Sequence, residues 1–128
     1  MQLLSYAAYA LWIMRVLAAS GKPIIKLKLA EWLGIDEGFV QQILIRLMKA
    51  GLVKSMRGAS GGYYMPGRPR TITWQAVIEA ATQRPIMRIE EGDPPLLGEA
   101  RTHVRETLLP ALQRSILEWP LPPAPKKK

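Results

Sequence analysis

Apolar residues in this chain recur at steps of three and four, the spacing that places side chains on one face of an α-helix. The segment Leu3–Ala19 is almost wholly apolar and is closed by Gly21 and Pro23, which predicts a buried first helix. The residues of this helix that are spaced to pack on the rest of the domain are Tyr6, Ala10, Ile13, Met14 and Leu17.

The segment from Leu27 to Ala50 predicts two helices joined by a tight turn, the arrangement of a helix-turn-helix. Ala30 is small where the second helix must cross the first, and Gly34 can adopt the positive φ that the turn requires. Asp36 is placed to cap the second helix, because its carboxylate can accept the unpaired N–H groups of the first turn. The side chains expected to hold the two helices together are Leu29, Leu33, Ile35, Val40 and Ile43.

The second of these helices has an apolar face and a polar face. Its apolar positions follow three- and four-residue steps and are expected to be buried: Val40, Ile43, Leu44 and Leu47. The opposite face is expected to meet DNA, and it is formed by Glu37, Gly38, Gln41, Gln42, Ile45, Arg46 and Lys49.

A glycine-rich hairpin is predicted directly after this helix. Gly51 ends the helix, and the runs Leu52–Arg57 and Tyr63–Pro66 flank Gly58, Gly61 and Gly62. Arg57 lies at the hairpin tip, where it is either an ordinary solvated charge or a side chain placed to enter a minor groove. The adjoining helix-turn-helix favours the second interpretation.

Two further helices are predicted beyond the hairpin. Thr73 is expected to cap a helix over Trp74–Gln83. In the segment 96–119, apolar residues recur every four positions and form a stripe that is too long for so small a domain to cover. Either a second subunit covers this stripe, or the helix folds back on its own domain. The stripe consists of Val104, Leu108, Leu112 and Ile116.

Pro110 interrupts this last helix, because proline removes a backbone donor and clashes with the preceding turn. A kink or break is therefore expected near Thr107–Leu109. The sequence as a whole predicts a mostly α fold with a small β-hairpin wing. A winged helix-turn-helix domain (1–83) is followed by a connecting loop (84–95), a long C-terminal dimerisation helix (96–119) and a flexible, Pro- and Lys-rich tail (120–128).

Positive charge is concentrated in the helix-turn-helix half of the chain. Residues 1–70 contain ten Lys or Arg against three Asp or Glu, a net charge of +7, whereas residues 71–128 contain eight against seven, a net charge of +1. Such an asymmetry is expected when one half of a protein faces phosphates, because neutralising them releases counterions. A ribosomal or membrane-surface partner would produce a similar asymmetry.

Several classes of protein are disfavoured by the composition. The chain has no cysteine, so disulfides, thiolate catalysis and zinc fingers are excluded. It also lacks a glycine-rich phosphate loop followed by lysine and a histidine with a nucleophile partner, which argues against an enzyme. The apolar N-terminus lacks a basic leader and is interrupted by Arg15, so we expect a cytoplasmic protein without a membrane partner.

The chain resembles the Rrf-type bacterial winged-helix regulators, the group of IscR, NsrR and CymR. The likeness extends from about Tyr6 to Ala81, and its most specific part is the helix end and wing KAGLVKSMRGASGGY, Lys49–Tyr63. The resemblance implies a homodimeric transcription factor whose recognition helices enter successive major grooves of a palindromic operator, and repression is the expected mode. Arg57 matches the minor-groove arginine of the family.

The same resemblance suggests which residues read DNA bases. The family carries a polar pair after the aromatic residue of its recognition helix, and here Gln41 and Gln42 follow Phe39 and Val40. A glutamine can pair with adenine through two hydrogen bonds, so this pair is expected to alter the preferred operator. Gly38 removes a possible side-chain contact from the same groove. The expected phosphate contacts are Lys28, Arg46, Lys49, Lys54 and Ser60.

The sensing part of the family is where this sequence departs most. Cluster-binding members have three cysteines before the dimerisation helix, whereas the segment from Arg84 to His103 has none, so no iron–sulfur cluster is expected. His103 is the single histidine and makes a poor metal site on its own. Relatives without a cluster suggest that a small molecule or a regulatory partner protein changes DNA affinity. A degenerate member that binds a partner protein without operator binding is the alternative function.

Overall fold

The computed structural model describes residues 3–85 and 95–121, so most of the predicted connecting loop and tail lie outside the described residues. The fold is mostly helical with one two-stranded antiparallel sheet, as predicted. Its elements in chain order are α1 (Leu3–Ala19), α2 (Lys26–Leu33), α3 (Glu37–Lys49), β1 (Lys54–Met56), β2 (Gly62–Tyr64), the 3-10 turn η1 (Pro69–Thr71), α4 (Trp74–Thr82), α5 (Pro95–Leu112) and the 3-10 turn η2 (Ile116–Glu118).

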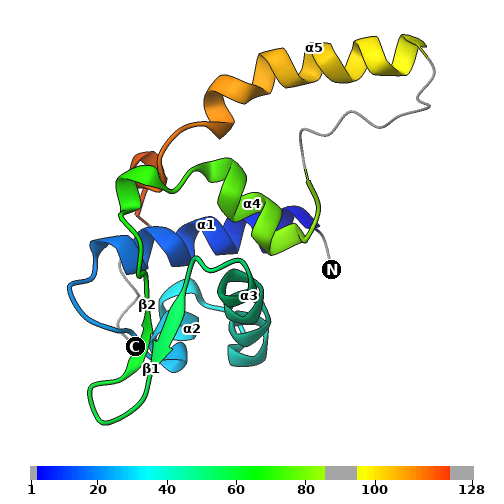
Figure 1. The fold of residues 1–128 in the computed structure, drawn as a ribbon. Helices are drawn as coiled ribbons and strands as arrows, with labels where there is room; N and C mark the ends of the chain where they lie inside the picture. Colours follow the sequence, from blue (N-terminus) through cyan, green and yellow to red (C-terminus); the bar gives the residue numbers. More distant parts are fainter. Residues whose placement is uncertain (1–2, 86–94, 122–128) are drawn as a thin grey trace.

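Helix α1 lies at the centre of the fold. In Figure 1 it runs between α4 on one side and α2, α3 and the hairpin on the other. Ile13 and Met14 of α1 are fully buried, as are Leu44 and Leu47 of α3 and Val77 of α4. The five predicted packing residues of α1 are all buried, which confirms the prediction of a buried first helix. No helix among residues 3–85 and 95–121 is long and apolar enough to cross a membrane.

The helix-turn-helix forms as the sequence predicts. Gly34 adopts a left-handed conformation with φ +68°, and the following Ile35 donates its backbone N–H to the carbonyl of Ala30 over 3.1 Å. Asp36 caps α3 by accepting a hydrogen bond of 3.0 Å from the backbone N–H of Gly38. The predicted apolar face of α3 is completely buried, so the polar face is turned outward.

The hairpin is anchored to the segment between α1 and α2, a contact that the sequence pattern did not reveal. Lys54 pairs with Tyr64 and Met56 with Gly62, and Tyr63 exchanges backbone hydrogen bonds of 2.9 and 2.7 Å with Ile24. Gly62 has φ +146°, and a Cβ at this position would lie 2.6 Å from the backbone of Ile24. The close approach of these two backbones therefore requires glycine.

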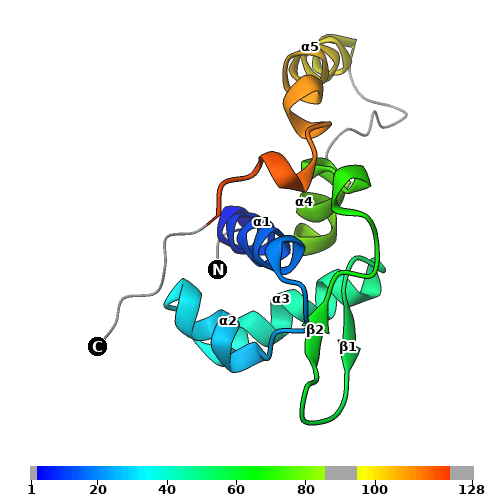
Figure 2. The same ribbon diagram turned by 90° about the vertical axis from the view of Figure 1, so that its left-hand side faces the viewer.

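Helix α5 extends away from the body of the fold in both Figure 1 and Figure 2. Its residues Val104 and Leu108 are 51% and 45% exposed, and Leu112 is half-buried. Of the kink or break predicted near Thr107–Leu109, the break is wrong, because the helix continues through Pro110 and ends at Leu112, while a kink stays a prediction.

The predicted single helix over 96–119 is also wrong at its C-terminal end. After Leu112 the chain turns, and Ser115 and Glu118 form a capping box that begins η2. Ile116 is therefore not part of the exposed stripe: it is 0% exposed, and its backbone N–H donates to the carbonyl of Ile72 over 2.8 Å. This correction moves Ile116 from the expected dimer interface to the core of the fold.

Candidate nucleic-acid interface

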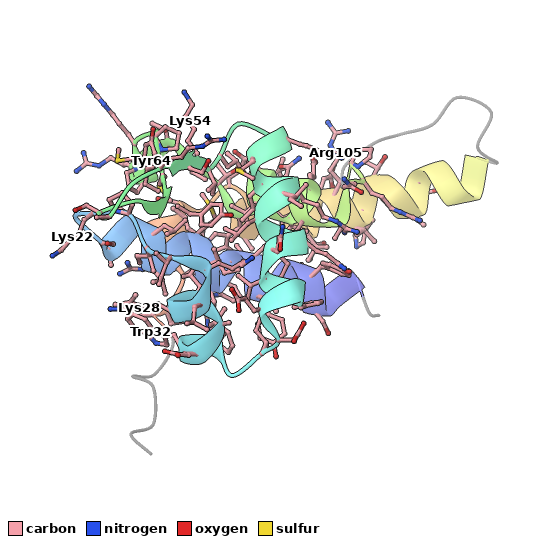
Figure 3. All side chains as sticks on the ribbon, turned by 90° about the horizontal axis from the view of Figure 1, so that it is seen from below. Lys22, Lys28, Trp32, Lys54, Tyr64 and Arg105 are labelled. Atoms are coloured by element: carbon pink, nitrogen blue, oxygen red, sulfur yellow. The ribbon has the colours of Figure 1, made fainter. Side chains whose placement is uncertain are left out.

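Polar and basic side chains lie around α3 on the face opposite α5. Figure 3 views this face from below, with α3 upright in the middle, the hairpin at the upper left and α2 at the lower left. Lys22, Lys28 and Lys54 come from three different segments and lie on this side of the molecule (Figure 3). All three are exposed. The fold thus places three of the ten basic residues of the first seventy on the surface that surrounds α3.

The two predicted base-contacting glutamines are exposed on α3, and each has its amide oxygen engaged by another side chain. Lys26 donates from Nζ to Oε1 of Gln41 over 3.0 Å, and the same Nζ lies 3.7 Å from the Glu37 carboxylate. The Tyr6 hydroxyl donates to Oε1 of Gln42 over 2.9 Å. The two glutamines are therefore restrained differently. Gln41 meets its partner Lys26 at the surface, whereas Tyr6, the partner of Gln42, is only 9% exposed.

Gly38 has a local structural reason in addition to its place on the outward face. Its backbone N–H donates the hydrogen bond that the Asp36 carboxylate accepts, and a Cβ at this position would lie 2.9 Å from the Asp36 Oδ2 atom. A side chain here would have to displace the capping carboxylate. The first turn of α3 therefore has no side chain at this outward-facing position.

The tip of the hairpin is open to solvent. Arg57 and Ser60 are exposed, and Gly58 between them has φ +109°. A Cβ at Gly61 would lie 2.2 Å from the carbonyl oxygen of Met56, so the tip is as tight as glycine allows. Lys28, Lys49 and Lys54, which were predicted to contact phosphates, are also exposed. Whether these residues contact DNA stays a prediction.

Arg46 differs from the other predicted phosphate contacts, because its side chain is turned inward. Its Nη1 donates to the carbonyl of Ala81 at the end of α4 over 2.6 Å, and its guanidinium carbon lies 4.2 Å from the centroid of the Tyr6 ring. Both contacts are part-buried. This side chain joins α3 to α4 and α1, so we expect it to act within the protein rather than as the phosphate contact that the sequence suggested.

This arrangement is found in a known family. Residues 3–118 match the profile of the Rrf2 family, which is described as "Iron-dependent Transcriptional regulator". The chain belongs to the Rrf2 family. Its members are DNA-binding transcriptional regulators and not enzymes.

Two relatives and one solved structure illustrate the similarity. The HTH-type transcriptional regulator CymR of Bacillus subtilis is 33% identical over 122 residues, covering 92% of this chain and 88% of CymR. The IscR regulator of Aliivibrio salmonicida is 35% identical over 85 residues, and the match covers 65% of this chain and 51% of IscR. The chain thus matches about half the length of IscR. The structure of B. subtilis CymR, "the Global Cysteine Regulator", has a TM-score of 0.76 at 30% identity and covers 91% of this chain and 93% of CymR.

The family description mentions iron, which raises the question of whether this chain has the ligands for it. It contains no cysteine, so the thiolates that hold iron–sulfur clusters are absent from its sequence. Among residues 3–85 and 95–121, no group of three His, Asp or Glu side chains is placed to hold a metal ion. The donor set of this Rrf2-family chain does not fit a cysteine-ligated cluster.

Two residues of this surface were missed in the sequence analysis as partners of the glutamines. Tyr6 was assigned only to the core, and Lys26 was assigned no role. Tyr6 lies thirty-six residues from Gln42 in the sequence, so only the packing of α1 against α3 brings them together. Lys26 lies fifteen residues before Gln41 and reaches it across the helix-turn-helix. No local sequence signal identifies either contact.

Proposed function

We propose that this Rrf2-family regulator binds a palindromic operator as a homodimer and represses transcription from the promoter it occupies. In this proposal α3 enters the major groove with Gln41 and Gln42 towards the base edges, and Arg57 enters the neighbouring minor groove. The single observation that supports it best is that the hairpin and the exposed polar face of α3 lie on the same side of the molecule (Figure 3), while Arg57 in the glycine-rich turn of that hairpin is exposed.

The proposed phosphate contacts are Lys28, Lys49, Lys54 and Ser60. They are exposed on or next to the elements that would lie along the DNA backbone, and lysine ammonium groups neutralise phosphates without reading sequence. Affinity for DNA is therefore expected to fall steeply with salt. Sequence preference is expected to depend on the glutamines and on Arg57 instead.

The proposed dimer interface is the remaining part of the apolar stripe on α5. Val104 and Leu108 are exposed, and Leu112 follows at the same four-residue step. Helix α5 has 18 residues and is therefore about 27 Å long, which suffices for a partner helix to pack against it. Rows of side chains spaced by four favour a crossing angle of about −50° between helices. We therefore propose that the two α5 helices cross.

We also propose that the protein acts without a cofactor. The chain lacks cysteine, so we infer that DNA affinity is changed by a small molecule or by a regulatory partner protein rather than by an iron–sulfur cluster. A preparation without visible absorbance from a cluster is the expected result.

The test of the DNA-binding proposal is an operator selection with the purified chain, followed by affinity measurements on Arg57→Ala at fixed salt. Loss of a minor-groove arginine should weaken binding by about 1 to 3 kcal/mol and reduce the preference for A·T pairs at that groove. Arg105→Ala is the matched control, because Arg105 is an exposed arginine on α5, a helix that extends away from the body on the side opposite α3 (Figure 1). It should bind like the wild type.

Two outcomes would contradict the proposal. Unchanged affinity and base preference in Arg57→Ala would show that the wing is not part of the DNA interface. A chain that selects no duplex but binds a partner protein tightly would instead favour the alternative of a protein-interaction module.

A further inference from the structure

The Tyr6 side chain connects the hydrophobic core to the surface of the recognition helix. It belongs to α1 and is 9% exposed, and its ring centroid lies 5.0 Å from that of Phe39. Its hydroxyl donates to Oε1 of Gln42 over 2.9 Å. A largely buried phenol normally keeps a hydrogen-bond partner, because an unpaired hydroxyl loses the bonds that water would provide. Gln42 supplies that partner from an exposed helix face.

The positive charge of Arg46 near this contact favours one orientation of the Gln42 amide. The Arg46 guanidinium carbon lies 4.2 Å from the Tyr6 ring centroid, and Arg46 is one helical turn from Gln42 on α3. A fixed positive charge favours a carbonyl oxygen as its neighbour and disfavours an amide NH₂ group. The hydrogen bond of Arg46 to the Ala81 carbonyl holds the guanidinium in place. The orientation with Oε1 towards Tyr6 is therefore the favoured one.

This orientation limits what Gln42 can offer to DNA. A glutamine pairs with adenine through two hydrogen bonds only when its oxygen and its nitrogen both point at the base edge. With Oε1 turned back to Tyr6, the outward part of the amide is Nε2, which is a donor only. Guanine presents two acceptors in the major groove and thymine presents one, whereas adenine combines an acceptor with a donor.

Building on the operator binding proposed above, we propose that Tyr6 is a positioning residue that makes Gln42 a hydrogen-bond donor towards DNA, so that the base opposite Gln42 is guanine or thymine rather than adenine. Tyr6 itself does not touch DNA in this proposal. Gln41 is different, because its oxygen is held by the surface residue Lys26, and a nearby phosphate can compete for that ammonium group. Gln41 keeps the freedom to pair with adenine.

The test compares operator selections by the wild type, Gln42→Ala, Tyr6→Phe and Tyr9→Phe. Gln42→Ala identifies the base position, because only there should its preference disappear. At that position the wild type should select guanine or thymine, and Tyr6→Phe should shift the preference towards adenine by about tenfold, the effect of one base-edge contact. Tyr6→Phe keeps the ring that packs on Phe39 and Arg46, so thermal unfolding should remain cooperative.

Tyr9→Phe is the matched control, because Tyr9 is one turn along α1 and its ring also packs edge-on against Phe39, with centroids 5.6 Å apart. It should leave base preference unchanged. If Tyr6→Phe folds, binds DNA and keeps the wild-type preference, or if the wild type selects adenine opposite Gln42, the inference is overturned while operator binding stands. If no variant and no wild-type chain binds any duplex, the proposed function is overturned and this inference with it.

Discussion

Replacing Ile116 with alanine tests whether this residue belongs to the core of the monomer or to a dimer interface. Ile116 is 0% exposed within one subunit, so its side chain is expected to stabilise the monomer. Truncation of a buried isoleucine to alanine commonly costs about 2 to 5 kcal/mol, through lost burial and the cavity that remains. The turn η2 has only three residues and can partly close that cavity, so we expect about 3 kcal/mol. For a chain of this length the melting temperature should fall by about 10 °C.

Leu108→Ala is the comparison variant, since Leu108 is 45% exposed and lies on the proposed dimer stripe. Urea unfolding and sedimentation should be measured for both variants over a range of protein concentrations, because dimer formation adds a concentration-dependent term to stability. Ile116→Ala should lower the free energy of unfolding at every concentration, whereas Leu108→Ala should mainly weaken the dimer. If Ile116→Ala left unfolding within about 0.5 kcal/mol of the wild type and weakened only the dimer, the assignment of Ile116 to the core would be refuted.

Two further predictions concern the hairpin and α3. Gly62→Ala should lower the free energy of unfolding by about 1 to 3 kcal/mol, because the φ of Gly62 is +146° and a Cβ there would overlap the Ile24 backbone. Gly21→Ala is the control: Gly21 has open space around it, so this variant should change the free energy of unfolding by less than about 0.5 kcal/mol. Arg46→Met should cost about 1 to 3 kcal/mol in stability with an unchanged salt dependence of DNA binding, since its guanidinium bonds to protein. Lys49→Met should leave stability unchanged and reduce the slope of log affinity against log salt concentration by about one. Fluorescence titrations of DNA binding at several salt concentrations would measure that slope.

The elements that could be predicted from the sequence are those whose signals are local. Gly34 and Asp36 act on backbone groups within a few residues, so the turn and the start of α3 are encoded where they occur. The buried face of α3 is equally local, because helical periodicity determines which residues share a face. The glycines of the wing also indicate a tight hairpin without knowledge of the rest of the fold.

The predictions that the structure changes concern residues whose environment depends on distant segments. Arg46 has a polar side chain at the border of the exposed face, and its inward turn depends on a carbonyl that only the packing of α4 brings within reach. Ile116 continues the four-residue spacing of Leu108 and Leu112, so periodicity alone extended the helix too far. A local signal did exist, because Ser115 and Glu118 have the spacing of a capping box, which marks a new start rather than a continuation.

Helix α1 connects the parts of this protein that operator recognition would require. At one end Tyr6 bonds to Gln42 of the recognition helix, and nearer the other end Arg15 donates from Nε to the carbonyl of Trp119, beyond η2, over 2.9 Å. Ile13 and Met14 between them are fully buried, so α1 cannot shift without disturbing the core. The segment that follows α5 and the helix that carries the glutamines are therefore positioned by the same rigid element. The connection from α5 to η2 is tied to the body as well, because the backbone N–H of Trp74 donates to the carbonyl of Arg114 over 2.9 Å.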